Sequence, residues 1–159
     1  MANFTRGAFY GIGDGPGIFE ATKTMVGHIN TNDGIYFGDN LITINRNLSF
    51  LEDEKLMAAF NAHALTEIEQ GTLWRLYVNC HFAKRAMALD GDIVECACYR
   101  GTTARIIADY VDLAESDKGI WLYDMFEHDE SMRHHAMTGH SPICSARSRR
   151  GLPISKMPT

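Results

Sequence analysis

The chain has 159 residues, of which 45% are hydrophobic and 22% are charged, and its formal net charge is -5. This length suffices for one domain with a real core, and the composition is typical of a soluble globular protein. No apolar run approaches the ~20 residues of a membrane span, and the N-terminus lacks a basic-then-apolar signal segment. We therefore expect a cytoplasmic protein that does not bind membranes.

Charge is distributed unevenly along the chain. All 20 acidic residues lie before residue 131, whereas the segment from residue 141 onward contains basic residues and no acid. An acidic body argues against nucleic-acid binding. The partner that we expect is a small molecule, and a homo-oligomer is left open.

The first 35 residues are rich in glycine, and four glycines occupy alternate positions from Gly11 to Gly17. A phosphate-binding loop is disfavoured there, because no Gly-Lys-Ser/Thr follows and no apolar strand precedes the glycines. We expect a turn-rich, mobile entry segment instead. The apolar run 41–44 is predicted to be either a strand or an extended lead-in.

Two helices are predicted next. A capping box from Ser49 to Glu52 predicts that the first helix begins at Ser49. The second is predicted to run from about residue 67 to residue 89, with Gly71 as a weak point near its start. One stripe of this helix is predicted to pack in the core: Trp74, Tyr77, Val78, His81, Phe82, Ala86 and Leu89.

Residues 92–124 predict a strand, a tight turn, a helix and a second strand. The run 93–98 is apolar except for Glu95, which is typical of a strand covered on both faces in a parallel sheet. Gly101 permits the turn. Either Thr102 or Thr103 is predicted to cap the helix, whose buried face repeats at residues 104, 107, 108 and 111.

The second strand, 120–123, ends at Asp124. Because the carboxyl ends of parallel strands and the helix N-terminus meet at one edge, Glu95 and Asp124 are predicted to lie near each other. An acidic residue in that position can accept hydrogen bonds from both ribose hydroxyls, so the unit predicts a nucleoside site. NAD is a weaker candidate, because a dinucleotide site requires three glycines and this turn contains only Gly101.

The segment E-C-A-C-Y-R-G at 95–101 resembles motif I of class I S-adenosylmethionine-dependent methyltransferases. The segments W-R-L-Y-V at 74–78, D-G-D-I-V-E-C at 90–96, Y-R-G at 99–101 and W-L-Y-D-M-F-E at 121–127 resemble the macrocin O-methyltransferase family. This resemblance covers residues 36–141. It implies a Rossmann-like α/β fold, with an incomplete parallel sheet preceded by N-terminal helices.

The resemblance also implies three regions. Residues 1–89 would form a mobile segment and a helical lid on the substrate side. Residues 90–140 would begin the cofactor-binding core, and 141–159 form an atypical basic tail. The cofactor would be S-adenosylmethionine, and the methyl acceptor a hydroxyl of a sugar or another small natural product.

The residues that the resemblance implies for cofactor binding lie in the turn and after the second strand: Glu95, Ala97, Tyr99, Arg100, Gly101, Thr102, Thr103, Asp124, Met125 and Phe126. The family usually has glycine where this chain has Ala97, so an extra methyl group faces the methionine part of the cofactor. His134 or His135, in a polar loop at the mouth of the pocket, is predicted to be the general base for the acceptor hydroxyl.

No metal site is predicted. The four cysteines, at 80, 96, 98 and 144, lack C-x-x-C spacing and are expected to be free, buried thiols. The full-length family implies a divalent metal such as Mg²⁺, but the carboxylates that would hold it belong to the later part of that fold and are expected to be missing here.

The tail from Ser141 has neither helical nor strand periodicity. We predict that it is a frameshift product, because another reading of permissible codons spells an acidic amphipathic helix; sequencing the gene tests this. The alternatives are a naturally short chain whose basic tail docks on a partner, or a non-catalytic fragment that keeps part of a nucleoside pocket or only a partner-binding surface.

Overall fold

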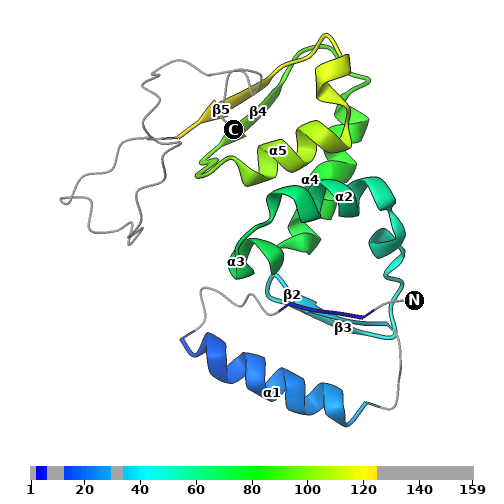
Figure 1. Cartoon of the computed structure of the whole chain (residues 1–159), viewed down its shortest axis with the longest axis vertical. Coiled ribbons are helices and arrows are strands. Elements are labelled where there is room, and N and C mark those ends of the chain that lie inside the picture. Colours follow the sequence, from blue (N-terminus) through cyan, green and yellow to red (C-terminus); the bar gives the residue numbers. More distant parts are fainter. Residues whose placement is uncertain (1–2, 7–12, 30–33, 125–159) are drawn as a thin grey trace, which may run out of the picture. The chain divides into compact units, whose positions relative to one another are not determined.

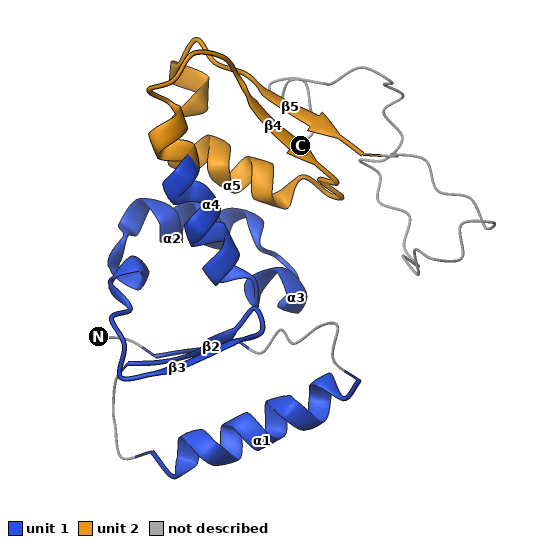
Figure 2. Cartoon of the chain, turned by 180° about the vertical axis from the view of Figure 1, so that it is seen from behind, with its two compact units in different colours: residues 1–82 blue, residues 83–159 orange. Residues whose placement is uncertain are grey.

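The computed structural model describes residues 3–6, 13–29 and 34–124, and these form a mixed α/β structure (Figure 1). The chain divides into two compact units, Met1–Phe82 and Ala83–Thr159, which Figure 2 colours separately. The division falls inside helix α4 (Leu73–Ala86), whereas the boundary expected from the sequence is residue 90. Within the described ranges, none of the helices is both long and apolar enough to cross a membrane.

The first unit contains a three-stranded sheet in the order β1-β2-β3, with β1 at Phe4–Thr5, β2 at Ile35–Gly38 and β3 at Leu41–Ile44. The strand alternative for 41–44 is thus confirmed. Strands β2 and β3 are antiparallel, and Asp39 and Asn40 join them with φ angles of 52° and 56°. Two consecutive left-handed residues are what a tight two-residue hairpin requires.

Helix α1 (Gly15–Gly27) covers one face of this sheet, and α2, α3 and the start of α4 lie on the other (Figure 1). The prediction of a turn-rich entry segment is therefore wrong for residues 13–29. The Asp14 side chain accepts a hydrogen bond from the Gly17 N–H (2.8 Å), and proline occupies the first turn. This start signal outweighs the glycines, because an N-cap and an N-terminal proline both favour helix initiation.

Helix α2 (Glu54–His63) begins later than predicted. Residues Ser49–Glu52 form a 3-10 turn, and Asp53 caps α2 by accepting from the Leu56 N–H at 3.0 Å. A complete capping box occurs instead at Thr66 and Glu69, where it opens α3 (Glu67–Gln70). The single helix predicted over 67–89 is therefore two helices, since the chain breaks at Gly71 before α4 begins.

The buried face of α4 differs from the predicted aromatic stripe. Leu73, Leu76 and Cys80 are almost completely buried, whereas Phe82 is 64% exposed and Trp74 is 37% exposed. The aromatic side chains instead pack on one another beside α2, as in the stacking of Tyr77 on Phe50 with ring centroids 4.8 Å apart. Both stripes have helical spacing, so periodicity alone could not choose between them.

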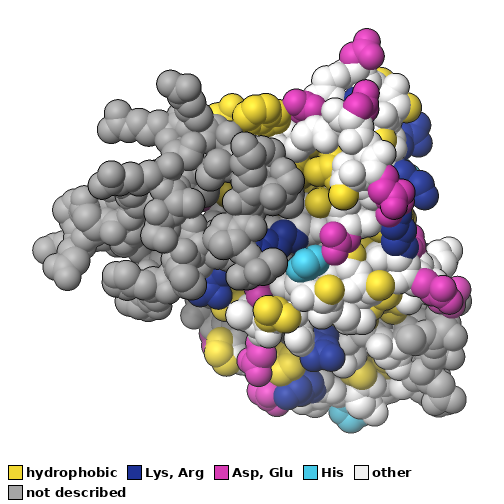
Figure 3. All heavy atoms as spheres, turned by 45° about the horizontal axis from the view of Figure 1, so that its top comes forward, with side chains coloured by type: hydrophobic (Ala, Val, Ile, Leu, Met, Phe, Trp, Pro, Cys, Tyr) yellow, Lys and Arg dark blue, Asp and Glu magenta, His cyan; other side chains and the backbone are white. Residues whose placement is uncertain are grey.

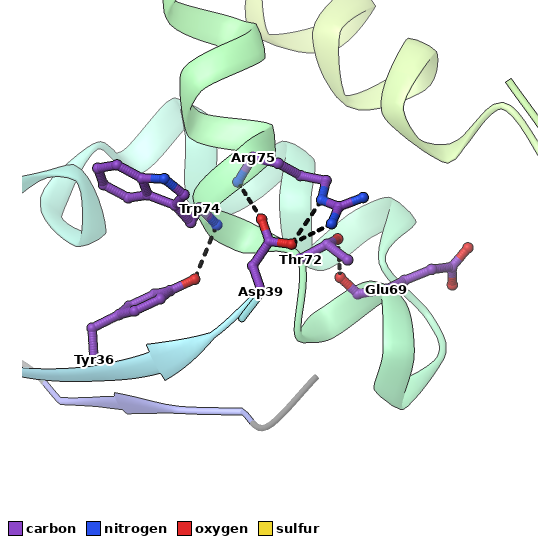
Figure 4. A network of polar contacts seen from close by, with 6 residues as sticks. All are labelled: Tyr36, Asp39, Glu69, Thr72, Trp74 and Arg75. Carbon is purple, nitrogen blue, oxygen red and sulfur yellow. Dashed lines mark hydrogen bonds and ion pairs between the residues drawn. The ribbon is translucent and has the colours of Figure 1, made fainter. Parts of the chain in front are cut away.

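The β2–β3 hairpin caps the start of α4 (Figure 4). The Tyr36 hydroxyl accepts from the Trp74 N–H at 3.0 Å, and Asp39 Oδ2 accepts from the Arg75 N–H at 2.8 Å. Asp39 Oδ1 also accepts from the Arg75 guanidinium, with Nε 2.8 Å away. The first turn of a helix has amide groups without intrahelical partners, and here residues from a distant hairpin satisfy two of them.

The second unit contains the predicted strand, turn, helix and strand, which the structure confirms. Strand β4 (Ile93–Cys96) pairs in parallel with β5 (Ile120–Tyr123), and Cys96 lies opposite Tyr123. Helix α5 (Thr102–Tyr110) connects them and is followed by a 3-10 turn at Leu113–Glu115. The apolar face of α5 consists of Ala104, Ile106, Ile107 and Ala108.

Among the described residues, α5 packs on one face of this two-stranded sheet and side chains on the other face are exposed, so the prediction of a strand covered on both faces is wrong. Ile120 and Leu122 are buried, but Val94 is 57% exposed and Tyr123 is 50% exposed. Strand side chains alternate between faces, and α5 packs on one of them. Cys96 shares the open face, so the expectation that it is a buried thiol is also wrong; Cys98, in the turn beyond the strand, is buried.

Candidate functional site

Two carboxylates lie at the carboxyl ends of the paired strands β4 and β5. Glu95 lies on β4 opposite Leu122, and Asp124 directly follows the last residue of β5. The charge of Asp124 is close enough to contribute to a raised pKa at Glu95. The predicted juxtaposition of these two side chains is therefore present, because parallel pairing aligns the ends of the two strands.

The turn between β4 and α5 has left-handed backbone at every second residue. The φ angles are 59° at Ala97, 49° at Tyr99 and 71° at Gly101. The Ala97 N–H donates to the Tyr123 carbonyl at 2.7 Å, and the Tyr99 N–H donates to Asp124 Oδ2 at 2.6 Å. These bonds tie the turn to the end of β5, so the loop and Asp124 form one unit.

The left-handed conformation of Ala97 gives a physical reason for a glycine at this position. Left-handed backbone costs a residue with a Cβ about 1–2 kcal/mol, and a glycine at the same position avoids this cost. The larger conformational entropy of glycine in the unfolded state offsets about 0.5–1 kcal/mol of that stabilisation. An Ala97→Gly variant is expected to raise the free energy of unfolding of the second unit by about 0.5–1 kcal/mol. Urea unfolding followed by Trp121 fluorescence, in a Trp74→Phe background, measures it.

The matched control for this prediction is Ala114→Gly, because Ala114 is exposed, lies in the same unit and has no positive φ. It should leave the free energy of unfolding unchanged or lower it by up to about 1 kcal/mol. An equal loss of stability in both glycine variants would contradict the strain assigned to Ala97.

Helix α5 begins without the predicted threonine cap. Gly101 is the N-cap residue and makes no side-chain hydrogen bond, and Thr102 and Thr103 already belong to the helix, so the prediction of a cap at either threonine is wrong. Glu95, which lies on β4, partly replaces this cap, because its carboxyl group hydrogen-bonds the backbone of Ala104 in the first turn of the helix. A carboxylate there also interacts favourably with the helix dipole.

The protonation of Glu95 is perturbed by its surroundings. Burial raises the pKa of this carboxyl group from 4.5 to about 7, with a smaller contribution from Asp124, while the hydrogen bond with Ala104 opposes the rise. Its Oε2 atom is buried and has no hydrogen-bond partner in the part of the chain that the structure describes. Burial disfavours the charged form, so Glu95 changes its protonation near neutral pH.

This shift predicts how stability depends on pH. Since the folded-state pKa of Glu95 lies above its unfolded value, the stability that its protonated form contributes is present below about pH 4.5 and is lost as the pH rises through about 7. The unfolding midpoint of the second unit is expected to fall over this interval, and Glu95→Gln should flatten that fall. Urea unfolding at a series of pH values tests this, with the exposed Glu115→Gln as the control.

Arg100 is the remaining charged residue of the turn between β4 and α5. Its guanidinium carbon lies 5.2 Å from the centroid of the Tyr99 ring, within the range of a cation–π contact. Its Nε atom is buried and lacks a hydrogen-bond partner among the described residues. The Tyr99 side chain itself is 40% exposed.

The structure brings together eight of the predicted site residues: Glu95, Ala97, Tyr99, Arg100, Gly101, Thr102, Thr103 and Asp124. The other four, Met125, Phe126, His134 and His135, lie outside the described residues. Sequence reasoning missed the backbone of Ala104 as a partner of Glu95. Its position in the first turn of the predicted helix was the available signal, since amides there need acceptors from elsewhere.

Neither the surface charge nor a cluster of metal ligands points to a further function for the site that the described residues form. On the face drawn in Figure 3, acidic and basic side chains are interspersed over the described surface. Across residues 3–6, 13–29 and 34–124, no three or more His, Cys, Asp or Glu side chains come together as a metal site. The chemistry that can be derived from the described site is therefore that of two carboxylates, one guanidinium and the amides of a left-handed turn.

Comparison of the chain with protein families, with curated proteins and with solved structures gives no significant match. The resemblance to macrocin O-methyltransferases thus stays a prediction that depends on the motifs quoted above.

Proposed function

We propose that this protein is an S-adenosylmethionine-dependent O-methyltransferase with a class I, Rossmann-like fold, acting on a hydroxyl of a sugar or another small natural product. The observation that carries the proposal is the position of Glu95 and Asp124 at the ends of two paired parallel strands beside the left-handed turn, where the Tyr99 N–H donates to Asp124 at 2.6 Å. Nucleoside cofactors bind at such strand ends in open α/β folds.

The described residues fit a cofactor that has a nucleoside at one end and an amino acid at the other. Asp124 would hold the ribose hydroxyls, because an acidic residue after the second strand can accept hydrogen bonds from both. Two buried polar atoms, Glu95 Oε2 and Arg100 Nε, lack hydrogen-bond partners within the described ranges, as is expected where a ligand supplies the missing partners. Gly101 and Thr102 would lie along its length.

In the proposed reaction, the cofactor supplies an electrophilic methyl group on a sulfonium. The cofactor would transfer this methyl group to the acceptor hydroxyl and leave as the neutral thioether, and His134 or His135 is the proposed base that would take the hydroxyl proton. The contribution of the described residues is to hold the cofactor in one orientation, since alignment of the reacting groups supplies much of the acceleration in such transfers. A divalent metal, as the family resemblance implies, would help to ionise the hydroxyl.

Isothermal titration calorimetry of the full chain with S-adenosylmethionine tests the proposal, with NAD as the comparison ligand. We expect saturable binding of S-adenosylmethionine at a stoichiometry of one and no binding of NAD, because a dinucleotide site needs glycines that this turn lacks. Saturable binding of NAD alone would replace the proposal with a dinucleotide-binding protein.

A non-catalytic, nucleoside-binding domain is the second candidate. The observation that favours it is Ala97, whose methyl group stands on a strained left-handed backbone in the turn where the resembling family usually has glycine. Transfer of a labelled methyl group to a panel of sugar and polyphenol acceptors separates the two candidates. Binding without transfer in the wild type, and transfer in Ala97→Gly, would identify the methyl group at residue 97 as the cause.

A further inference from the structure

The face of the β4–β5 pair that points away from α5 exposes a group of apolar and aromatic side chains. Val94, Trp121 and Tyr123 are all exposed, and Cys96 is exposed as well. The parallel register sets Val94 opposite Trp121 and Cys96 opposite Tyr123, and alternate residues of a strand share a face. These four side chains therefore form one patch, which we call the exposed β4–β5 face.

A carboxylate lies at one end of the exposed β4–β5 face. Asp92 Oδ2 accepts from the Trp121 indole N–H at 2.7 Å, and Asp92 Oδ1 accepts from the Gly119 N–H at 2.8 Å. The bond from Trp121 is the main cause of the lowered pKa of Asp92, which keeps this carboxyl group ionised. An aromatic patch beside a carboxylate suits a segment with arginine side chains, because a guanidinium binds carboxylates and also stacks on aromatic rings.

A segment of this kind occurs later in the same chain. Residues 141–159 contain four basic side chains, no acidic one and several aliphatic ones. The stretch 83–124, to which the exposed β4–β5 face belongs, contains eight acidic and five basic side chains. The segment and the stretch that carries the face therefore have net charges of opposite sign, and they attract each other.

The connection between the two favours a contact within one molecule. Strand β5 ends at Tyr123, which belongs to the exposed β4–β5 face. Residues 125–140 span up to about 55 Å when extended, whereas a strand of four residues is only about 13 Å long. A tethered segment acts at an effective concentration of about millimolar, far above that of a second molecule in dilute solution. The chain's own segment is therefore favoured over a second copy.

We propose that residues 141–159 bind the exposed β4–β5 face of the same molecule. The arginine side chains of this segment would pair with Asp92 and stack on Trp121 and Tyr123, and its aliphatic side chains would cover Val94. The contact depends on the composition of the segment as it stands in the chain, whatever its genetic origin. The inference is independent of the proposed function, because no part of it involves the cofactor.

Two native cysteines test the contact in the full chain, since Cys96 lies on the exposed β4–β5 face and Cys144 lies in the segment. A short homobifunctional maleimide, added to dilute protein at low salt, should join Cys96 to Cys144 within one molecule, as peptide mass mapping detects. The combined change Arg147→Glu, Arg149→Glu and Arg150→Glu should lower the yield of this link by at least about fivefold, because it turns attraction into repulsion. Sodium chloride at about 1 M should also lower the yield.

The matched control reverses three exposed charges in the first unit, Lys23→Glu, Arg46→Glu and Lys55→Glu, and should keep the wild-type yield. Absence of the link in the wild type, or an equal yield in the arginine-reversed variant, overturns the proposal. A Cys96–Cys96 link between two molecules as the main product also overturns it, because a second copy would then cover the face. Should the arginine-reversed variant fail to fold by circular dichroism, glutamine at the same three positions decides: a lower yield supports the proposal, and an unchanged yield overturns it.

Discussion

An Asp39→Ala variant is expected to lose about 2–4 kcal/mol of unfolding free energy in the first unit. The Asp39 side chain is only 4% exposed, and its two oxygens accept from the Arg75 N–H and guanidinium, so one substitution removes a helix cap and a charge partner. Both charges are partly desolvated, and this burial raises the pKa of Asp39 and lowers that of Arg75. Removing one member of such a pair costs more than the intact pair contributes.

Because the Arg75 side chain is 46% exposed, water recovers part of this loss, and the expected effect is below that of a fully buried pair. Urea unfolding followed by Trp74 fluorescence, in a Trp121→Phe background, isolates the first unit. Asp39→Asn should cost less than the alanine variant, because asparagine keeps an acceptor and tolerates the left-handed backbone.

Glu20→Ala is the surface control for Asp39→Ala. It removes an exposed ion pair with Lys23, 2.8 Å apart on α1, and such pairs contribute only about 0–1 kcal/mol. A loss for Asp39→Ala no larger than that of Glu20→Ala would show that the hairpin does not stabilise the start of α4.

The second large effect is expected at Asp124. Asp124→Ala should weaken binding of S-adenosylmethionine by at least about a hundredfold, because it removes the proposed acceptor for both ribose hydroxyls and the partner of the Tyr99 N–H. Calorimetry of the full chain measures the change. The exposed Asp117→Ala, in the same unit, should bind as the wild type does.

Asp124→Asn separates the two roles of this side chain. Asparagine can still accept from the Tyr99 N–H, so the turn should keep its conformation, but one ribose hydroxyl loses its charged acceptor. Its affinity is expected to fall between those of the wild type and Asp124→Ala. Wild-type affinity in Asp124→Ala would exclude Asp124 from the binding site.

Local signals in the sequence were sufficient for the order of elements in the described part of the second unit. An apolar run, a glycine, a helical stripe and a second apolar run predicted β4, the turn, α5 and β5, and right-handed connection placed Glu95 near Asp124. These inferences succeed because each depends on neighbours in the chain. The same reasoning could not predict the left-handed backbone at Ala97 and Tyr99, since neither alanine nor tyrosine favours that conformation.

The first unit shows the limit of local signals. Asp14 and Pro16 start a helix where glycines suggest turns, and a serine that begins a capping-box pattern leads only into a 3-10 turn before Asp53 caps α2. In both cases two local signals compete. Which one prevails depends on what the resulting helix can pack against, as Phe19 of α1 does with Phe37 of β2 at 5.5 Å.

By itself, the sequence determined the order of elements from β4 to β5 and the shared position of two carboxylates, because hydrophobic period and turn chemistry act over a few residues. Only the tertiary structure decided which stripe of α4 is buried and that Tyr36 and Asp39 cap its first turn. It also decided that Val94 and Tyr123, on one face of the β4–β5 pair, are exposed. These features depend on groups far apart along the chain, whose approach no local pattern encodes.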